Sequence, residues 1–97
     1  MFMKKLSLVV ALVMGGVCVL LAQRTITGTV SDTNGEPLIG ATVLAKGTST
    51  GTTTDENGAY ELSIPNDVTI LLFSYTGYQP KEVNIGNSNT LDVTLET

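Results

Sequence analysis

The stretch from Gly47 to Leu62 constrains the fold more than any other part of this sequence. A Gly/Thr-rich segment leads into the turn Asp55-Glu56-Asn57-Gly58, and an alternating run begins at Tyr60. Asn-Gly is a strong hairpin signal, because both central residues of a type I′ turn need a positive φ. Threonine suits a pleated strand, and Tyr60, Leu62 and Ile64 would share one face of the next strand. We therefore predict a β-hairpin whose strands carry no evident catalytic residue.

The sequence on either side of this stretch also has the period of β-strands. Apolar residues alternate with threonines from Arg24 to Val30, and Ala41 to Lys46 reads as a second strand. Val68 to Tyr75 is apolar on both faces, which predicts a central strand covered on both sides. Two further alternating strands follow, with these side chains facing inward: Val83, Ile85, Leu91, Val93 and Leu95. About seven short strands at this spacing predict an all-β fold, an antiparallel seven-stranded β-sandwich of the Ig-like or transthyretin-like kind.

The first 22 residues have a different character and are predicted to be a helical signal peptide. A short basic start ends at Lys5, and a nearly continuous apolar run extends from Leu6 to Leu21. Ala22 supplies a small residue where signal peptidase would cut, which leaves residues 23–97 as the mature domain. An uncleaved membrane anchor is the alternative, since a bilayer needs roughly 17 to 25 apolar residues. In either case the domain is exported.

Charge and residue usage exclude several classes of function. Cleavage leaves three basic side chains (Arg24, Lys46 and Lys81) against nine acidic ones, a net charge of −6, which argues against nucleic-acid binding. The chain has no histidine, the commonest general base and metal ligand. Its one cysteine, Cys18, lies in the leader, so no disulfide is expected, and Val17 before it is too large for a lipoprotein site.

Candidate acidic sites are better read as turns. Asp55, Glu56 and Asn57, with Glu61 beyond them, offer the oxygen ligands that calcium prefers, but no twelve-residue loop with a terminal bidentate Glu surrounds them. Asp32 and Asn34 raise the same question and have the same answer. Asp55 and Glu61 could in principle form an acid/base pair on a glycosidic bond, although solvated turn residues are the simpler interpretation. We predict no catalytic residue, no metal site and no cofactor.

The remaining candidates are hydroxyl, aromatic and amine groups. Ser74 has no histidine to activate it. Three tyrosines could form an aromatic platform that binds a sugar, or they could pack in the core or at its rim. We favour packing, because Tyr60 faces inward. A lysine–asparagine crosslink at Lys46 or Lys81 has no support beyond composition. The three tyrosines are Tyr60, Tyr75 and Tyr78.

Several motifs together resemble a known domain family. The run Gly-Thr-x-x-Gly-Thr-x-Thr-Asp-x-Asn-Gly-x-Tyr, from Gly47 to Tyr60, resembles the signature of carboxypeptidase-regulatory-like (CarboxypepD_reg-like) domains. The order of the other motifs resembles the N-terminal extension of TonB-dependent outer-membrane receptors of the SusC/RagA type, over roughly Arg24 to Glu96. Those motifs are Thr27-Gly28-Thr29-Val30, Asp32 to Leu38, Ile39 to Val43, Phe73 to Tyr78 and Leu91 to Leu95.

The resemblance implies a non-enzymatic accessory domain on the periplasmic face of a Gram-negative outer membrane. In such receptors it precedes a plug and a barrel that import glycans or peptides with energy from TonB. The implied partners are that plug and barrel, the TonB system or a surface glycan-binding lipoprotein. The sequence given ends at Thr97 without plug or barrel. A free-standing exported module that binds a glycan or a protein is therefore the alternative, and the regulatory domain of a secreted carboxypeptidase would require zinc ligands that this chain lacks.

Overall fold

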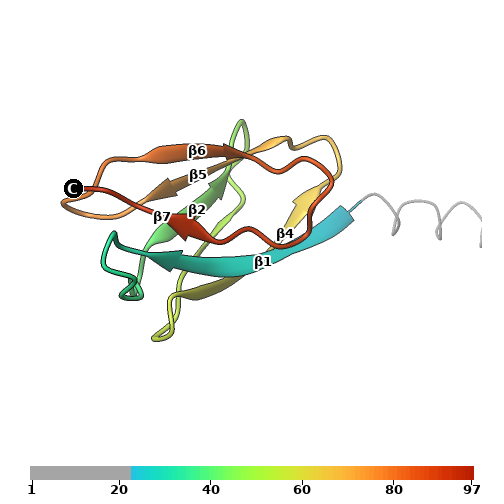
Figure 1. Cartoon of the computed structure of the whole chain (residues 1–97). Helices are drawn as coiled ribbons and strands as arrows, with labels where there is room; N and C mark the ends of the chain where they lie inside the picture. The colour runs from blue at the N-terminus through green and yellow to red at the C-terminus, as the bar shows by residue number, and fades with distance from the viewer. Residues whose placement is uncertain (1–22) are drawn as a thin grey trace, which may run out of the picture.

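The computed structural model describes residues 23–97 as two packed β-sheets (Figure 1). One sheet has the strand order β4-β1-β7 and the other the order β3-β2-β5-β6. The predicted all-β sandwich is confirmed, whereas the predicted signal peptide lies outside the described residues. The strands are β1 (Gln23–Ser31), β2 (Thr42–Ala45), β3 (Gly51–Thr53), β4 (Ala59–Pro65), β5 (Ile70–Ser74), β6 (Lys81–Asn84) and β7 (Val93–Thr94).

The two longest strands, β1 and β4, show how the alternating sequence forms the sandwich. They pair antiparallel, with Ile26 opposite Leu62. Tyr60, Leu62 and Ile64 are all buried, which confirms the face predicted for them, while the residues between them point outward. The threonines of β1 likewise occupy its exposed face. Burial of one face of each strand thus fixes the register, because a slip of one residue would expose the whole apolar set.

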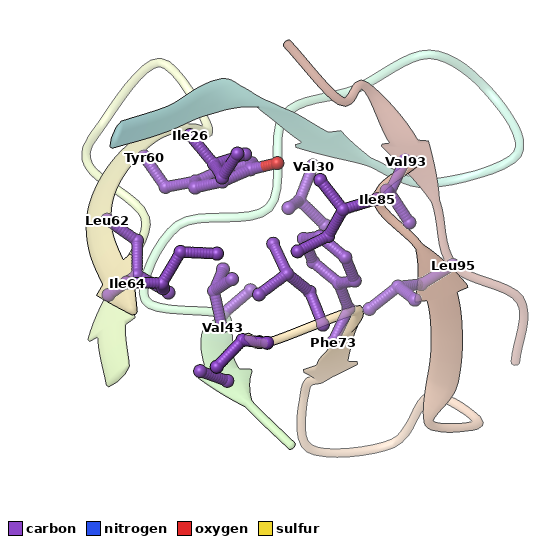
Figure 2. Packing of buried hydrophobic residues seen from close by; sticks show 14 of the residues in the cluster. Ile26, Val30, Val43, Tyr60, Leu62, Ile64, Phe73, Ile85, Val93 and Leu95 are labelled. Carbon is purple, nitrogen blue, oxygen red and sulfur yellow. The ribbon is translucent and has the colours of Figure 1, made fainter. Parts of the chain in front are cut away.

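The core is formed by apolar side chains from the inner faces of both sheets (Figure 2). The rings of Tyr60 and Phe73 meet edge to face, with centroids 5.6 Å apart and an interplanar angle of 70°. This contact joins β4 of one sheet to β5 of the other. The largest fully buried side chains each stabilise the fold by about 1.5–3 kcal/mol relative to exposure. They are Phe73, Ile26, Ile64, Leu71, Leu95, Val30 and Val43.

Strand β5 is central in its sheet but is not covered on both sides. It lies between β2 and β6, and Leu71 and Phe73 point into the core. Leu72 between them is only half-buried, on the outer face of the sheet. The expectation of two covered faces is therefore wrong. An outward leucine on a two-layer sandwich has no third layer above it and meets neighbouring side chains of its own sheet instead.

The predicted hairpin between Gly47 and Leu62 is also wrong. Its first strand, β3, pairs with β2 in one sheet, and its second strand, β4, pairs with β1 in the other. The turn is not type I′ either, because no residue other than glycine has a positive φ within the described part of the chain, and only Gly58 of this turn does (φ 73°). Asp55 N donates to Ala59 O, and Gly58 N donates to Asp55 O. This turn carries the chain between the sheets.

One strand pair departs from the expected antiparallel arrangement. β7 runs parallel to β1, with Val30 opposite Val93 and Ser31 opposite Thr94. The chain leaves β6 on one sheet and crosses to the other before β7 begins, so β7 enters in the same direction as β1 (Figure 1). A crossing between layers removes the constraint that makes hairpin-connected neighbours antiparallel.

A buried threonine fixes the loop between β1 and β2. The Thr54 hydroxyl donates to Leu38 O and accepts a hydrogen bond from Ala41 N at 2.9 Å. The Thr54 backbone also bonds to this loop, donating to Ala41 O and accepting from Gly40 N. Leu38, Ala41 and Thr54 are buried, and buried backbone groups without partners are costly. The hydrogen bonds of Thr54 therefore hold the loop between β1 and β2, which forms no strand of its own.

The first prediction concerns Thr54→Val, which keeps the shape of the side chain and removes the hydroxyl. We expect a loss of about 2 kcal/mol or more in unfolding free energy, because Ala41 N and Leu38 O lose their partner. Thr53→Val is the matched control, since Thr53 is exposed on β3, and it should change stability by about 0.5 kcal/mol or less. Urea unfolding followed by circular dichroism measures both. Equal stability of the two variants would contradict the role given to the hydroxyl.

The second prediction uses two turns with the same pattern. Gly35 and Gly58 occupy equivalent places after Asp-x-Asn, and both have positive φ (83° and 73°). A Cβ at Gly35 would meet nothing within 4 Å, whereas one at Gly58 would lie 2.6 Å from Val30 O and 2.9 Å from Pro37 Cβ. Gly35→Ala should cost about 1 kcal/mol for the backbone conformation alone, and Gly58→Ala about 3 kcal/mol or more. Similar losses in urea unfolding would show that the close packing at Gly58 carries no energy.

Candidate functional site

The two acidic turns are closed by their own aspartates. Asp32 Oδ1 accepts hydrogen bonds from Asn34 N and Glu36 N, both at 2.9 Å. Asp55 Oδ1 accepts from Asn57 N at 2.8 Å and Ala59 N at 3.0 Å. In each turn one carboxylate oxygen is thus directed at the backbone, as in an Asx turn, rather than at a metal position. Within residues 23–97 no group of three or more His, Cys, Asp or Glu side chains could hold a metal ion.

Asp55 and Glu61 do share one shallow depression, which extends over β3 and β4. Both carboxylates are exposed. A general acid on a glycosidic bond works in an apolar setting that excludes water, whereas both of these side chains are open to water. The arrangement favours the solvated-turn interpretation of this pair.

Tyr60 is a core residue with a polar end, and not part of an aromatic platform. Its side chain is 5% exposed, and its hydroxyl donates to the Leu91 carbonyl oxygen at 2.7 Å. This bond passes directly over Gly28. A Cβ at Gly28 would lie 1.8 Å from Leu91 O and 3.0 Å from the Tyr60 hydroxyl oxygen. Glycine is therefore required at position 28 for the hydroxyl and the carbonyl to meet.

The same bond explains an interruption in the pairing of β1 with the chain leading to β7. Thr27 accepts from Leu91 N, and Ser31 accepts from Leu95 N, both at 2.9 Å. At this spacing Thr29 N would donate to Leu91 O in a regular parallel ladder. Leu91 O instead faces Tyr60, and Thr29 N donates to Asp92 Oδ1 at 3.0 Å. A carboxylate thus takes the place of a backbone carbonyl.

We call these five residues the β7 clasp: Gly28, Thr29, Tyr60, Leu91 and Asp92. The Thr29 hydroxyl also donates to Asp92 Oδ1, at 3.1 Å, so that both polar groups of Thr29 hold the same oxygen. Burial raises the pKa of Tyr60 to about 12, and the negative charge of Asp92 contributes to the rise. The clasp has the features of a structural site, since its hydroxyl is protonated at neutral pH and already donates its proton to the backbone.

The other two tyrosines lie at the end of the sandwich where the chain reaches Thr97. The rings of Tyr75 and Tyr78 are tilted by 49° with centroids 5.6 Å apart, in the loop between β5 and β6. Both are half-buried and pack against the core rim, as predicted. Ser74 and Tyr75 line a shallow depression beside Gly40. Next to it in the chain stands Ile39, at 56% the one strongly exposed large apolar side chain among the described residues.

Within residues 23–97, the two lysines contact a carboxylate and a backbone carbonyl. Lys46 Nζ lies 2.8 Å from Glu82 Oε1, in an ion pair whose two side chains are about half exposed. Lys81 Nζ donates to Thr94 O at 3.5 Å. These partners do not supply the amide that a lysine–asparagine crosslink needs, so the geometry gives that possibility no support.

Sequence reasoning missed three residues with defined roles: Arg24, Thr54 and Asp92. Arg24 donates to Gly86 O, to Ser88 O at 2.6 Å and to Asn89 Oδ1 at 3.1 Å, and so secures the loop that leads to β7. No local pattern marks any of the three, because each acts on backbone groups at least thirteen residues away. The one local signal that could have pointed to a close approach is Gly28, a glycine on the inward face of a strand, and the sequence analysis did not use it.

The third prediction concerns the Tyr60 hydroxyl. Tyr60→Phe leaves Leu91 O without its donor and should lower the unfolding free energy by about 1–2 kcal/mol at pH 8. A tyrosine whose pKa is raised in the folded state contributes stability below the unfolded value near 10, and that stability is lost as pH rises toward about 12. The wild type should therefore lose up to about 1.4 kcal/mol per pH unit more than the variant in this range.

Urea unfolding of both proteins between pH 8 and pH 12 measures this difference. Other groups that titrate in this range are common to both proteins and cancel. Parallel stability curves above pH 10 would contradict the assignment of the shift to Tyr60.

Among residues 23–97 no helix is long and apolar enough to cross a membrane.

Comparison with solved structures supports the fold. A chain of a type II cohesin–X-dockerin complex from Acetivibrio cellulolyticus superposes with a TM-score of 0.51 at 23% identity. The match covers 72% of this chain and 51% of that one. At this level of identity the likeness concerns the fold alone.

Comparison with curated proteins finds three TonB-dependent receptors. Two receptors of Formosa agariphila are 36% identical over 75 residues and 43% identical over 73 residues, which is 77% and 75% of this chain. The receptor SusC of Bacteroides thetaiotaomicron is 42% identical over 63 residues, or 65% of this chain. The matches span only 6% to 7% of the length of these relatives.

The family model for the CarboxypepD_reg-like domain matches residues 26–97, which include every strand except the first three residues of β1. The glycine and tyrosine of the β7 clasp and the Asp55 turn all lie within this match. The chain belongs to the CarboxypepD_reg-like domain family.

Proposed function

We propose that this chain is the exported N-terminal accessory domain of a TonB-dependent outer-membrane receptor for nutrients, either glycans or peptides. In this proposal residues 1–22 are the signal peptide and residues 23–97 are the domain on the periplasmic face. The observation that carries the proposal is the identity of 36% to 43% with three TonB-dependent receptors over most of the domain. The two Formosa agariphila matches each cover about three quarters of this chain and a small part of a much longer protein.

The polar chemistry of the domain supports an accessory role without catalysis. Catalysis needs a group whose pKa and position are set for reaction with a bound molecule. Here the Tyr60 hydroxyl donates to Leu91 O, and Asp32 and Asp55 bind the backbone of their own turns. Asp92 holds Thr29. These groups contribute to folding, so the functional surface of the domain is its exterior.

The path of the chain suits a module in line with a larger body. β1 begins at one end of the sandwich, and Thr97 lies at the opposite end (Figure 1). The end near Thr97 also carries Ile39 and the pair Tyr75 and Tyr78, which are the exposed or half-exposed apolar groups suited to contact with a following domain. The receptor body is accordingly the first partner to test, ahead of TonB itself.

The fourth prediction addresses the receptor assignment directly. An antibody raised against residues 23–97 should detect, in fractionated cells, an outer-membrane protein far larger than the 10.2 kDa of this chain. A strain in which the coding sequence for these residues is deleted is the control for antibody specificity. A small band confined to the periplasmic fraction would overturn the proposal and favour a free-standing exported module that binds a glycan or a protein.

A further inference from the structure

Strand β4 has one edge without a strand partner. β4 is the outermost strand of its sheet and pairs only with β1 (Figure 1). The backbone groups of Thr27 face the β7 side, since Thr27 N donates to Asn89 O and Thr27 O accepts from Leu91 N. The alternate residues of β1 therefore bond to β4, and their partners there include Tyr60 and Leu62. It follows that the backbone N–H and C=O groups of Glu61 and Ser63 point away from β1.

The unpaired part of the β4 edge is short, because a turn closes it at each end. Ala59 N and O bond to Asp55, and Pro65 O accepts from Val68 N, so the turns at the two ends of β4 use their own backbone groups. Between them Glu61 and Ser63 are exposed, and the depression shared by Asp55 and Glu61 lies alongside. Two N–H and two C=O groups can pair with an extended segment of about five residues.

The two sides of the sandwich are connected differently. On the β4 side, β3 of the other sheet lies near β4 and lines the same shallow depression, but it does not pair with it. On the opposite side, Gln79 N just before β6 donates to Glu96 O just after β7 at 2.7 Å. Lys81 Nζ reaches Thr94 O across the same gap. Arg24 secures the other end through Gly86 and Ser88. No such cross-connection is found at Glu61 and Ser63 within the part of the chain that the structure describes.

The charges around the open edge select its occupant. Glu61 lies at the middle of β4, Asp55 and Glu56 precede the strand, and Asp67 follows it. The three basic side chains of residues 23–97 are engaged elsewhere: Arg24 with the loop before β7, Lys46 with Glu82, and Lys81 with Thr94. A second copy of this edge would bring acid against acid, which is unfavourable. A segment rich in lysine or arginine would meet opposite charges at both ends and in the middle.

We propose that the β4 edge, defined as Glu61 to Ser63 with the flanking acids Asp55, Glu56 and Asp67, binds an extended basic peptide segment by strand addition. Backbone hydrogen bonds to Glu61 and Ser63 hold the peptide, and its basic side chains contact the acids. The edge belongs to residues 23–97 themselves, so its binding can be measured independently of the receptor assignment.

The fifth prediction is tested with the full chain, expressed for export, purified and labelled with ¹⁵N. The probe is a blocked synthetic heptapeptide in which lysine alternates with valine or threonine. Titration should shift the amide resonances of Glu61 and Ser63, and the affinity should fall as salt rises from 20 to 300 mM, roughly the range over which surface charges become screened. Glu61→Gln should weaken binding about fivefold. Glu82→Gln, the matched change on the edge strand β6, should leave it unchanged.

Two altered peptides keep the test independent of any variant that folds poorly. A peptide with glutamate in place of lysine should not bind. A lysine peptide methylated on alternate backbone nitrogens, on the edge that would pair, should also lose binding, because strand addition needs those N–H groups. Undiminished binding of the methylated peptide, shifts confined to β3 or β6, or no shift at all would each overturn the proposal. Self-association of the chain through Glu61 and Ser63 would identify a second copy as the occupant and would also overturn it.

Discussion

The hydrogen bond from Tyr60 to the Leu91 carbonyl is the interaction on which the closed sandwich depends. Its phenol ring packs edge to face on Phe73 of the opposite sheet, while its hydroxyl holds the chain that leads into β7. β7 has only two residues in ladder contact with β1, so backbone pairing alone secures it weakly. The absence of a side chain at Gly28 makes the bond possible, and Asp92 supplies the acceptor that Thr29 then lacks. One tyrosine thus joins three strands through apolar packing at one end and a directed bond at the other.

The two Asp-x-Asn-Gly turns act together, although 23 residues separate their aspartates in the sequence. Val30 N donates to Gly58 O, and Val30 O accepts from Leu38 N, so the end of β1 is held between the second turn and the loop that follows the first. Gly58 lies against Pro37, which explains why one glycine is crowded and the other open. Thr54 extends the same junction by binding Leu38 and Ala41. The two turns have the same local sequence pattern and a similar conformation. The loss of stability expected from a substitution differs between them, because it depends on the residues packed against each glycine.

Alternation along the sequence predicted which side chains face the core, because burial of one face of a strand imposes a period of two on any β-sandwich. Tyr60, Leu62 and Ile64 show this directly. The pairing of strands could not be predicted in the same way. β3 and β4 are separated by a good turn, yet each finds a different partner, and the parallel course of β7 depends on a crossing between layers that no local signal marks. Thr54, Arg24 and Asp92 were missed for the same reason, since each satisfies backbone groups far away in sequence. Asp32 and Asp55 lie in turns, as their sequence context predicts, because each carboxylate reaches the backbone N–H groups two and four residues further along the chain.

In this small domain several polar side chains are used to stabilise the fold. Contacts with a partner therefore fall to the outer surface. With about 75 residues in the sandwich, burial of apolar area is limited, and the hydrogen bonds of Thr54, Tyr60, Asp32 and Asp55 stabilise connections that a larger core would hold by packing. The two sides of the sandwich then differ in kind. Arg24, Gln79 and Lys81 bridge the side where β6 faces β7, whereas at β4 the backbone of Glu61 and Ser63 faces solvent among acids. Acidic residues on an edge strand discourage pairing between copies, and they do so without preventing pairing with a chain of opposite charge. The same residues can therefore protect the domain from aggregation and restrict the partners that its open edge admits.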